Sequence, residues 1–395
     1  MNLLQLLNKD FKNFSFDELK ESFIKTYGVV VKQFENKYIF KYDTILANYD
    51  RPITHECRGI ILYYLDNTWT YHSRVFDKFF NLDEGKHKWA SEAFLEKHLP
   101  HIRLIEKKDG SCVQVSYDRE HDNYLASTLG SIQTESVFDE PYTFSDLFWR
   151  LFNNAFKFKK DRTYIFEMWS RANQIVTDYG VEHLTLTAIR NFDGTYVPMD
   201  ELENIVKGTN IRRPIFIDKV FNNKDELVSF VEIESKNEEK YGRNPEGFVG
   251  YDILSMTPIF KIKNEKYCQY HRINSGDKRY ITKNLAIALF EGNIDDIFPD
   301  LTDTNKEYIE RLKKYLINLQ DTIDNIVPLL SDLHDKKAYA LEVNSQVAKY
   351  NLIKYSAFFF DMFGHITVMK EKPSILDWFK HKKHYNRYMS LIKDL

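Results

Sequence analysis

The sequence predicts an α+β domain over residues 1–276, followed by an all-helical domain over residues 277–395. Three observations support this division. Short runs of β-forming residues dominate from Gly28 to about Tyr270, with only a few helical patterns between them. From Gly292 to Gly364 no glycine intervenes, and apolar residues recur at steps of three and four, which is typical of a helix with one apolar face. The length of 395 residues exceeds that of one compact domain and suits two.

The α+β domain is expected to begin with a helical segment over residues 1–27, where leucines and phenylalanines recur at helical spacing. Five β-type runs follow up to about Tyr117: VVVKQF, KYIFKY, RGIILYYL, TWTYHSRVF and IRLIEK. A helix is expected over 139–160, after which β-type runs return as TYIFEMW, HLTLTAIRNF and GTYVPM. Helices near 199–207 and 223–234 precede the last two runs, EGFVGYDI and PIFKIK.

The all-helical domain is expected to contain one long helix, because residues 309–326 carry a single apolar stripe. Pro328 interrupts that pattern, since proline lacks the amide hydrogen that a helix interior needs. Helical patterns continue over residues 338–350, 352–369 and 375–392.

Composition excludes several classes of protein. Apolar residues make up 43% of the chain and charged residues 29%, which excludes a disordered chain. No apolar run approaches the roughly 18 residues of a membrane-spanning helix, and the N-terminus lacks the pattern of a secretory signal, so no membrane partner is expected. Three scattered cysteines form neither a disulfide framework nor a metal knuckle, which indicates a reducing cytoplasm. With a net charge of −3 there is no overall basic surface, so a nucleic acid must be bound by local patches.

The most informative motif is Lys107-Lys-Asp-Gly110, which follows a β-type run and turns the chain back. Alone, a K-x-D-G sequence is weak evidence, because a solvated hairpin turn explains it equally well. Glycine-rich phosphate loops of the G-x-G-x-x-G or G-x-x-x-x-G-K-[ST] type do not occur. A nucleotide would therefore be held by side chains.

Five further motifs accompany the K-x-D-G motif, in a fixed order along the chain. Each neighbouring motif places a charged residue beside or within a short β-run, and six such elements in order are improbable as ordinary strand charges. The motifs are Glu56-Cys57-Arg58-Gly59, Lys78-Phe79-Phe80-Asn81, Phe166-Glu167-Met168, Glu246-Gly247-Phe248-Val249 and Phe260-Lys261-Ile262-Lys263.

This ordered set resembles the covalent nucleotidyltransferases, the ligases and capping enzymes with a K-x-D-G nucleophile, and more narrowly the T-even phage RNA ligase 1 family. The resemblance extends from Tyr38 to Lys263 and rests on H-E-C-R-G-I, D-K-F-F-N-L, E-K-K-D-G-S, the run from Asn173 to Val176, E-G-F-V and F-K-I-K. It implies that residues 1–276 form an adenylyltransferase domain, an ATP-grasp-like ligase fold of antiparallel sheets with flanking helices. The helical domain has the position and size of that family's C-terminal domain, with a much looser match.

The resemblance implies a reaction in three steps. A lysine attacks the α-phosphate of ATP, AMP passes to an RNA 5′-phosphate, and a 3′-hydroxyl then displaces AMP. Carried over by motif, Lys107 is the nucleophile that forms lysyl-AMP. Because an ammonium cannot attack, we expect burial, Lys261, Lys263 and Mg²⁺ to depress the pKa of Lys107. Lys108 is expected to point the other way and is no substitute.

Two further pairs are assigned to the nucleotide and its metal. Lys261 and Lys263 lie two residues apart on one strand, so both reach the triphosphate from one face. Glu246 and Glu167 are expected to contact the ribose and the waters of a bound Mg²⁺, which Mn²⁺ could replace. Gly247 allows close backbone approach at the site.

The remaining adenylate-pocket positions also follow from the motif match. Arg58 is expected to contact phosphate or ribose through its planar guanidinium. The other positions are Tyr42, Lys78, Phe80 and Gly110.

Three features outside these motifs complete the expectations. Leu129 stands before a Gly-Ser pair, where the family usually has a basic residue, which puts a phosphate or base contact in doubt. Asp295 and Asp296 match an acidic pair that binds a second metal in the family, although adjacent aspartates are more often helix caps. The basic run 380–387 could follow RNA phosphates or be a solvated helix end.

The resulting hypothesis is an ATP-dependent RNA ligase that joins 5′-phosphate and 3′-hydroxyl ends, in repair of nicked tRNA. The helical domain is expected to supply RNA specificity in a monomer, in the host cytoplasm if the chain is phage-encoded. A DNA ligase or an mRNA guanylyltransferase shares the nucleophile, but usually continues with an OB-fold barrel where this sequence turns helical. A non-catalytic RNA-binding protein with a decayed nucleotide site remains the alternative from a different class.

Overall fold

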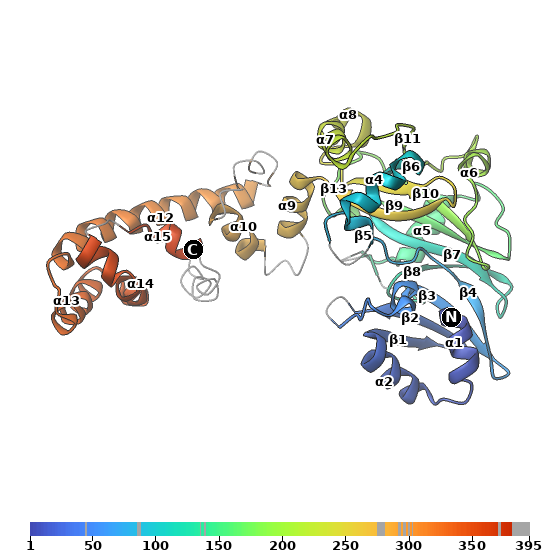
Figure 1. The fold of residues 1–395 in the computed structure, drawn as a ribbon, viewed down its shortest axis with the longest axis horizontal. Coiled ribbons are helices and arrows are strands. Elements are labelled where there is room, and N and C mark those ends of the chain that lie inside the picture. The colour runs from blue at the N-terminus through green and yellow to red at the C-terminus, as the bar shows by residue number, and fades with distance from the viewer. Residues whose placement is uncertain are drawn as a thin grey trace. The chain divides into compact units, whose positions relative to one another are not determined.

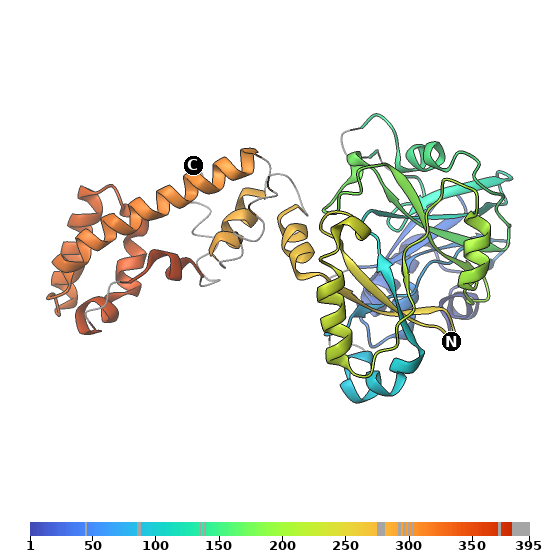
Figure 2. The same cartoon turned by 90° about the horizontal axis from the view of Figure 1, so that it is seen from above.

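The computed structural model describes residues 1–43, 46–84, 88–134, 136–137, 140–274, 281–290, 294, 298, 301, 303–369 and 373–380 (Figures 1 and 2). The chain divides into two compact units, Met1–Cys268 and Gln269–Leu395. The second unit thus begins at Gln269, whereas the sequence places the domain boundary at residue 277.

The first unit opens with two helices, α1 (Leu3–Asp10) and α2 (Phe16–Tyr27), as the sequence predicts. Both begin with a capping box, in which Asn2 or Ser15 accepts a hydrogen bond from the third helical amide. Gly28 ends α2 in the left-handed conformation, which only glycine adopts at little cost. The apolar faces of both helices pack onto the first sheet.

Three sheets carry the rest of the first unit. The first sheet has the order β1 (Val29–Phe34), β2 (Lys37–Tyr42), β3 (Arg58–Leu65) and β4 (Thr68–Ser73). The second sheet has the order β10 (His183–Asn191), β9 (Arg162–Trp169), β7 (Ser111–Asp118) and β8 (Asn123–Thr128). The third sheet has the order β11 (Phe216–Ile217), β6 (Ile102–Lys107), β12 (Gly247–Asp252), β13 (Thr257–Lys263) and β5 (Phe80–Asn81). Among the described strands every pairing is antiparallel except that of β13 with β5, so the predicted mixed fold with antiparallel sheets is confirmed.

The second and third sheets face each other across a buried apolar layer, to which β6 contributes Ile105 and β12 contributes Val249. The outer face of the second sheet is covered by α5 (Phe144–Phe152) and α6 (Met199–Val206). The outer face of the third sheet is covered by α4 (Glu92–His98) and α7 (Lys224–Glu234). Two shorter helices, α3 (Pro52–Glu56) and α8 (Glu238–Tyr241), lie in connections.

A buried lysine ties the first sheet to the second. Lys37 is fully buried at the start of β2. Its Nζ lies 3.0 Å from Glu35, 3.3 Å from Asp118 and 2.5 Å from Glu120, the last two on or just after β7. Asp118 also accepts a hydrogen bond from the Tyr63 hydroxyl at 2.8 Å. One ammonium therefore compensates a group of carboxylates at the junction of the two sheets.

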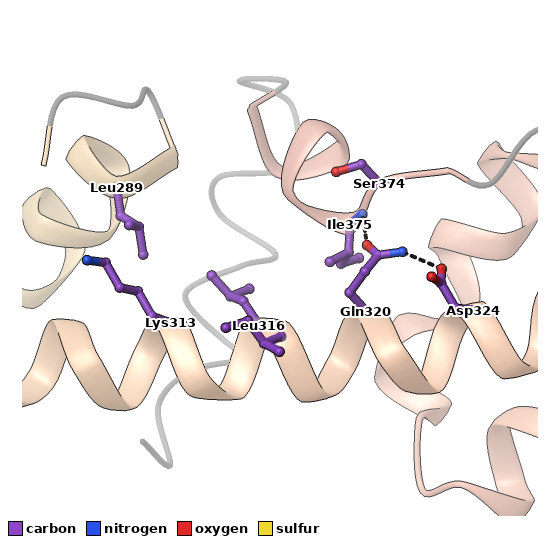
Figure 3. Close-up of a pocket in the computed structure, with 8 residues that line it drawn as sticks. Leu289, Lys313, Leu316, Gln320, Asp324, Ser374 and Ile375 are labelled. Atoms are coloured by element: carbon purple, nitrogen blue, oxygen red, sulfur yellow. Dashed lines mark hydrogen bonds between the residues drawn. The ribbon is translucent and has the colours of Figure 1, made fainter. Parts of the chain in front are cut away.

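In the second unit the described elements are helices. α9 (Glu265–Asn274) crosses the division, and α10 (Ile281–Phe290), α12 (Asp303–Leu330), α13 (Lys336–Lys349), α14 (Ser356–Asp361) and α15 (Ile375–Lys380) follow. The predicted apolar stripe of α12 is buried, and the helix ends two residues after Pro328. A hollow of about 510 Å³ lies along α12, where the Gln320 side chain accepts a hydrogen bond from the Ile375 amide and donates one to Asp324 (Figure 3).

Local differences from the expected elements have physical causes. The run GTYVPM forms no described strand; it folds back on β10 through hydrogen bonds from Asn191 to Thr195 and from Val197 to Ile189, and Pro198 cannot donate to a ladder. The helix expected over 139–160 is confined to α5, and the short helices α3 and α4 interrupt the expected β-rich region. Within the described part of the chain, no helix is long and apolar enough to cross a membrane.

Candidate active site

Lys107 ends β6, and strand pairing aligns it with two other predicted site residues. β12 lies between β6 and β13, so Gly247 stands opposite both Lys107 and Lys263. Two residues along, Val249 stands opposite Lys261. Because side chains alternate along a strand, the three lysines project from one face of the third sheet. This is the face on which Val249 packs toward the second sheet.

Glu246 joins two of these lysines. Its Oε2 lies 2.6 Å from the Nζ of Lys107, and its Oε1 lies 2.7 Å from the Nζ of Lys263. The Glu246 side chain is buried, and its carbonyl accepts a hydrogen bond from the Asn264 amide at 2.9 Å. By resemblance, Glu246 is expected to contact the ribose and metal-bound waters; in the structure each of its carboxylate oxygens instead pairs with a lysine ammonium.

The electrostatics distinguish Lys107 from Lys261. Burial lowers the pKa of Lys107, but the carboxylates of Glu246 and Glu167 outweigh burial and hold that pKa above its ordinary value. In this form of the site the pKa of Lys107 is thus raised, because two carboxylates lie beside it and Glu246 also pairs with Lys263, one of the cations expected to lower it. The lowering expected with Mg²⁺ bound stays a prediction. Burial, followed by the neighbouring cations Lys107 and Lys263, instead lowers the pKa of Lys261 to about 7.

Glu167 lies on β9, opposite Cys112 of β7 and Thr185 of β10. Burial raises the pKa of Glu167 to about 8, and the nearby Lys107 ammonium offsets only part of that rise. Glu167 is therefore a carboxyl group whose ionisation a further cation would favour.

Residues 108–110 between β6 and β7, here called the nucleophile loop, are fixed by Asp109, whose role the motifs do not predict. Asp109 is buried, and its Oδ2 accepts hydrogen bonds from the amides of Val176 at 3.0 Å and Thr177 at 2.8 Å. Its Oδ1 accepts a hydrogen bond from the Tyr267 hydroxyl at 2.8 Å. These partners are 67, 68 and 158 residues away along the chain, so no local pattern could reveal them.

Asn173, in the run that carries part of the resemblance, holds the other end of the loop. Its Nδ2 donates to the Oγ of Ser111 at 3.0 Å and to the carbonyl of Met168 at 2.9 Å. The segment after β9 thus wraps around the nucleophile loop from both sides.

Two glycines are required by neighbouring backbone. A Cβ on Gly110 would lie 2.5 Å from the carbonyl oxygen of Met168. Gly247 has φ +133°, and a Cβ there would lie 2.2 Å from the carbonyl oxygen of Ile262. The close approach expected at Gly247 is thus made by strand β13.

Arg58, at the start of β3, lies over the Phe79 ring at 4.6 Å. Its Nη1 is buried and has no hydrogen-bond partner among the described residues. Together with Lys107 and Glu167 it lines a cavity of about 60 Å³ between the second and third sheets. An unsatisfied guanidinium nitrogen in such a place fits an anionic ligand.

The other pocket positions cluster at the edge strand β5. The Nζ of Lys78 lies over the rings of Tyr42 at 5.4 Å, Tyr49 at 5.6 Å and Phe80 at 5.0 Å. Phe80 is buried and packs edge-on against Tyr49 and His55, two residues that the sequence analysis does not single out. The structure thus brings Tyr42, Lys78 and Phe80 together with a fourth ring from Tyr49.

Several residues singled out from the sequence do not join the group around Lys107 and Glu246, or lie outside the described residues. Asp295, Asp296 and the basic run beyond residue 380 lie outside the described residues. Leu129 packs against the apolar layer between the second and third sheets. Lys108 pairs with Glu106 at 2.5 Å and lies over the Tyr179 ring. Both Lys108 and Glu106 line the same cavity as Lys107, so the expected opposite direction of Lys108 stays a prediction. Among the described residues, no group of three or more His, Cys, Asp or Glu side chains could hold a metal by itself.

Comparison with known proteins identifies the family. The sequence model described as RNA ligase, of the T4 RNA ligase 1 type, matches residues 56–268. The chain belongs to the RNA ligase family. The matched region contains each predicted site residue of the first unit except Tyr42, so the recognition made from the motifs is confirmed.

An RNA ligase of Rhodothermus phage RM378 is 26% identical to this RNA ligase family member over 373 residues, covering 82% of each chain. Among solved structures, two forms of an archaeal ATP-dependent RNA ligase are similar, with TM-scores of 0.43 and 0.42 at 14% and 16% identity. They cover 84% and 86% of this chain, and 86% and 91% of the archaeal chains.

Proposed function

We propose that the chain is an ATP-dependent RNA ligase that joins 5′-phosphate and 3′-hydroxyl RNA ends. The observation that carries the proposal is the convergence of Lys107, Lys263 and Glu246 within ion-pair distance on one sheet face, in a member of the RNA ligase family. Arg58 lies beside this group, and its buried Nη1 has no hydrogen-bond partner among the described residues. Lys261 also lies beside it and has a pKa of about 7.

In the first step, the Nζ of Lys107 attacks the α-phosphorus of ATP; a nitrogen–phosphorus bond forms and the bond to pyrophosphate breaks. Lys107 must first lose a proton, and the Oε2 of Glu246, 2.6 Å away, is an acceptor within reach. Lys261 and Lys263 neutralise the charge of the departing pyrophosphate, and the anion in turn favours the protonated form of Lys261. AMP then passes to an RNA 5′-phosphate, and a 3′-hydroxyl displaces it.

The two carboxylates fit a divalent cation unequally. Each carboxylate oxygen of Glu246 already pairs with a lysine ammonium. Glu167 has a pKa of about 8, and a nearby cation would stabilise its ionised form. Mg²⁺, or Mn²⁺ in its place, would screen phosphate charge, with Glu167 and then Glu246 orienting its waters. Glu167 is also placed to bind the ribose, and Tyr42, Lys78 and Phe80 form the wall for the adenylate.

The finer parts of the proposal rest on family resemblance. The C-terminal residues 277–395 form an all-helical domain that selects the RNA, and the substrate is a nicked tRNA that a monomer repairs. The alternative of a non-catalytic RNA-binding protein requires a decayed site, and the intact contacts of Lys107, Glu246 and Lys263 favour catalysis.

The proposal is tested by joining 5′-phosphorylated, 3′-hydroxyl RNA with ATP and Mg²⁺. Ligation is expected with the wild type, and replacing Glu246 by Gln should reduce it by at least tenfold. RNA already carrying a 5′-adenylate should still be joined by Lys107→Ala, because that step bypasses the lysine. RNA binding without joining of either substrate by the wild type would favour the non-catalytic alternative.

A further inference from the structure

Two lysines on the first sheet lie on one face near the nucleophile loop. In the pairing of β1 with β2, Lys32 stands opposite Ile39 and Lys41 stands opposite Val30. Alternation along both strands places all four residues on the same face. Lys32 and Lys41 are both exposed to solvent.

The turn of residues 128–131, at the end of β8, lies against this face of the first sheet. The Nζ of Lys32 donates a hydrogen bond to the carbonyl of Gly130 at 3.0 Å. A Cβ on Gly130 would lie only 3.3 Å from the Nζ of Lys41. Ile132 packs on Ile39 just beyond the turn, which fixes the turn on the sheet. The two ammonium groups therefore converge on Gly130.

Around these groups lies a hollow of about 440 Å³, here called the lysine hollow. Its lining includes Lys32, Lys41, Ser111, Cys112, Leu129 and Phe144. A second hollow of about 270 Å³ shares Lys32, Lys41 and Gly130 with it. Ser111 and Cys112 directly follow the nucleophile loop, and Cys112 also lines the cavity that contains Lys107. The lysine hollow thus adjoins the reaction centre.

The positive charge at this turn comes from a neighbouring sheet and not from residue 129. Leu129 is uncharged; it lines the lysine hollow and packs against the apolar layer between the second and third sheets. The cations at this turn come instead from Lys32 and Lys41, which are distant in sequence and adjacent in the fold.

We propose that the lysine hollow binds the phosphate backbone of the RNA strand whose end is joined; this rests on the proposed ligase function. Two exposed ammonium groups and a Phe144 ring at the wall suit a single strand, which combines phosphate contacts with base stacking. The two adjoining hollows suit a polymer better than a single nucleotide. The triphosphate of ATP has its own cations in Arg58, Lys261 and Lys263.

The test compares K32A/K41A with a control, K97A/K207A, that removes two exposed lysines from α4 and from just beyond α6. Binding of a 5′-phosphorylated single-stranded RNA to the full-length protein is measured by fluorescence anisotropy over a series of salt concentrations. Self-adenylylation with labelled ATP is measured in parallel. For K32A/K41A we expect affinity to fall roughly tenfold at low salt and the slope of log K against log salt to fall by about 1.4. Self-adenylylation should stay within about twofold of wild type, and K41R should retain most RNA affinity.

Unchanged affinity and slope in K32A/K41A, or an equal loss in the control, would overturn the proposal. Loss of self-adenylylation with RNA binding intact would show that the lysine hollow serves the ATP triphosphate, which also overturns it. A wild type that binds RNA but never self-adenylylates would refute the proposed ligase function, and the binding comparison would still decide the role of the lysine hollow.

Discussion

Replacing Asp109 by Ala should destabilise the protein by roughly 3 to 6 kcal/mol. Asp109 is 2% exposed and accepts three hydrogen bonds, from the amides of Val176 and Thr177 and from the Tyr267 hydroxyl. Alanine leaves three buried donors without that acceptor, and each such loss costs about 1 to 3 kcal/mol. Three such losses, each in the low to middle part of that range, add up to roughly 3 to 6 kcal/mol.

A graded series separates the contacts. Asp109→Asn keeps one oxygen for the two amides and should cost about 1 to 2 kcal/mol, and Tyr267→Phe should cost about 1 kcal/mol. The matched control is Asp178→Ala, which removes an aspartate in the same segment that accepts only a turn hydrogen bond, from Gly180 at 2.8 Å. It should change stability by less than about 1 kcal/mol.

Urea denaturation of the full-length variants gives the free energies of unfolding, and hydrogen exchange reports locally on the amides of Val176 and Thr177. We expect those amides to exchange faster in Asp109→Ala in proportion to the loss. Self-adenylylation should fall as well, because the segment that wraps the nucleophile loop is released. If Asp109→Ala is no less stable than Asp178→Ala, or the two amides stay protected, Asp109 does not hold this loop.

Three further predictions concern charge and space. Lys37→Met should cost roughly 3 to 5 kcal/mol at pH 7, because it leaves the buried Asp118 carboxylate without its cation. The difference in stability from wild type should narrow below about pH 4, as the carboxylates take up protons. The control Lys20→Met, at an exposed helical ion pair, should cost less than about 1 kcal/mol. Equal losses in urea denaturation would contradict this. Since the pKa of Lys261 is about 7, binding of ATP without a divalent cation should take up close to one proton at pH 8 and little at pH 6. The divalent cation is left out because it would favour loss of a proton from Glu167. Calorimetry in buffers of different ionisation enthalpy measures the uptake, and uptake that persists in Lys261→Arg would assign it to another group. Gly110→Ala should lower self-adenylylation at least tenfold in a folded protein, because its Cβ meets the Met168 carbonyl; a rate within twofold of wild type would show that the loop adapts.

How far the sequence predicts the site depends on whether a contact is local. Alternation along one strand places Lys261 and Lys263 on one face, and the structure has them there. The ion pairs of Glu246 depend on β12 lying between β6 and β13, a pairing across 139 residues that no periodicity in a single run contains. The direction of the shift in the Lys107 pKa could not be predicted for the same reason, because it depends on that carboxylate.

The elements of the fold, like the site, could be predicted only where local sequence signals determine them. Helices with caps and apolar stripes, such as α2 and α12, are predicted by local signals. The run GTYVPM has strand-forming residues, yet Pro198 ends it before a ladder can form. The inward packing of Leu129 and the approach of Lys41 to Gly130 follow from the meeting of two sheets, which strand propensity does not specify.

The most direct test of the central claim is covalent labelling by α-labelled ATP and Mg²⁺, followed by a denaturing gel. Wild type and Lys108→Ala should both carry the label, because the Lys108 ammonium is held in an ion pair by the Glu106 carboxylate and is not the expected nucleophile. Lys107→Ala should carry none. Label that persists in Lys107→Ala, or that disappears in Lys108→Ala while Lys107 is intact, would contradict the assignment of Lys107 as the nucleophile of this RNA ligase family member.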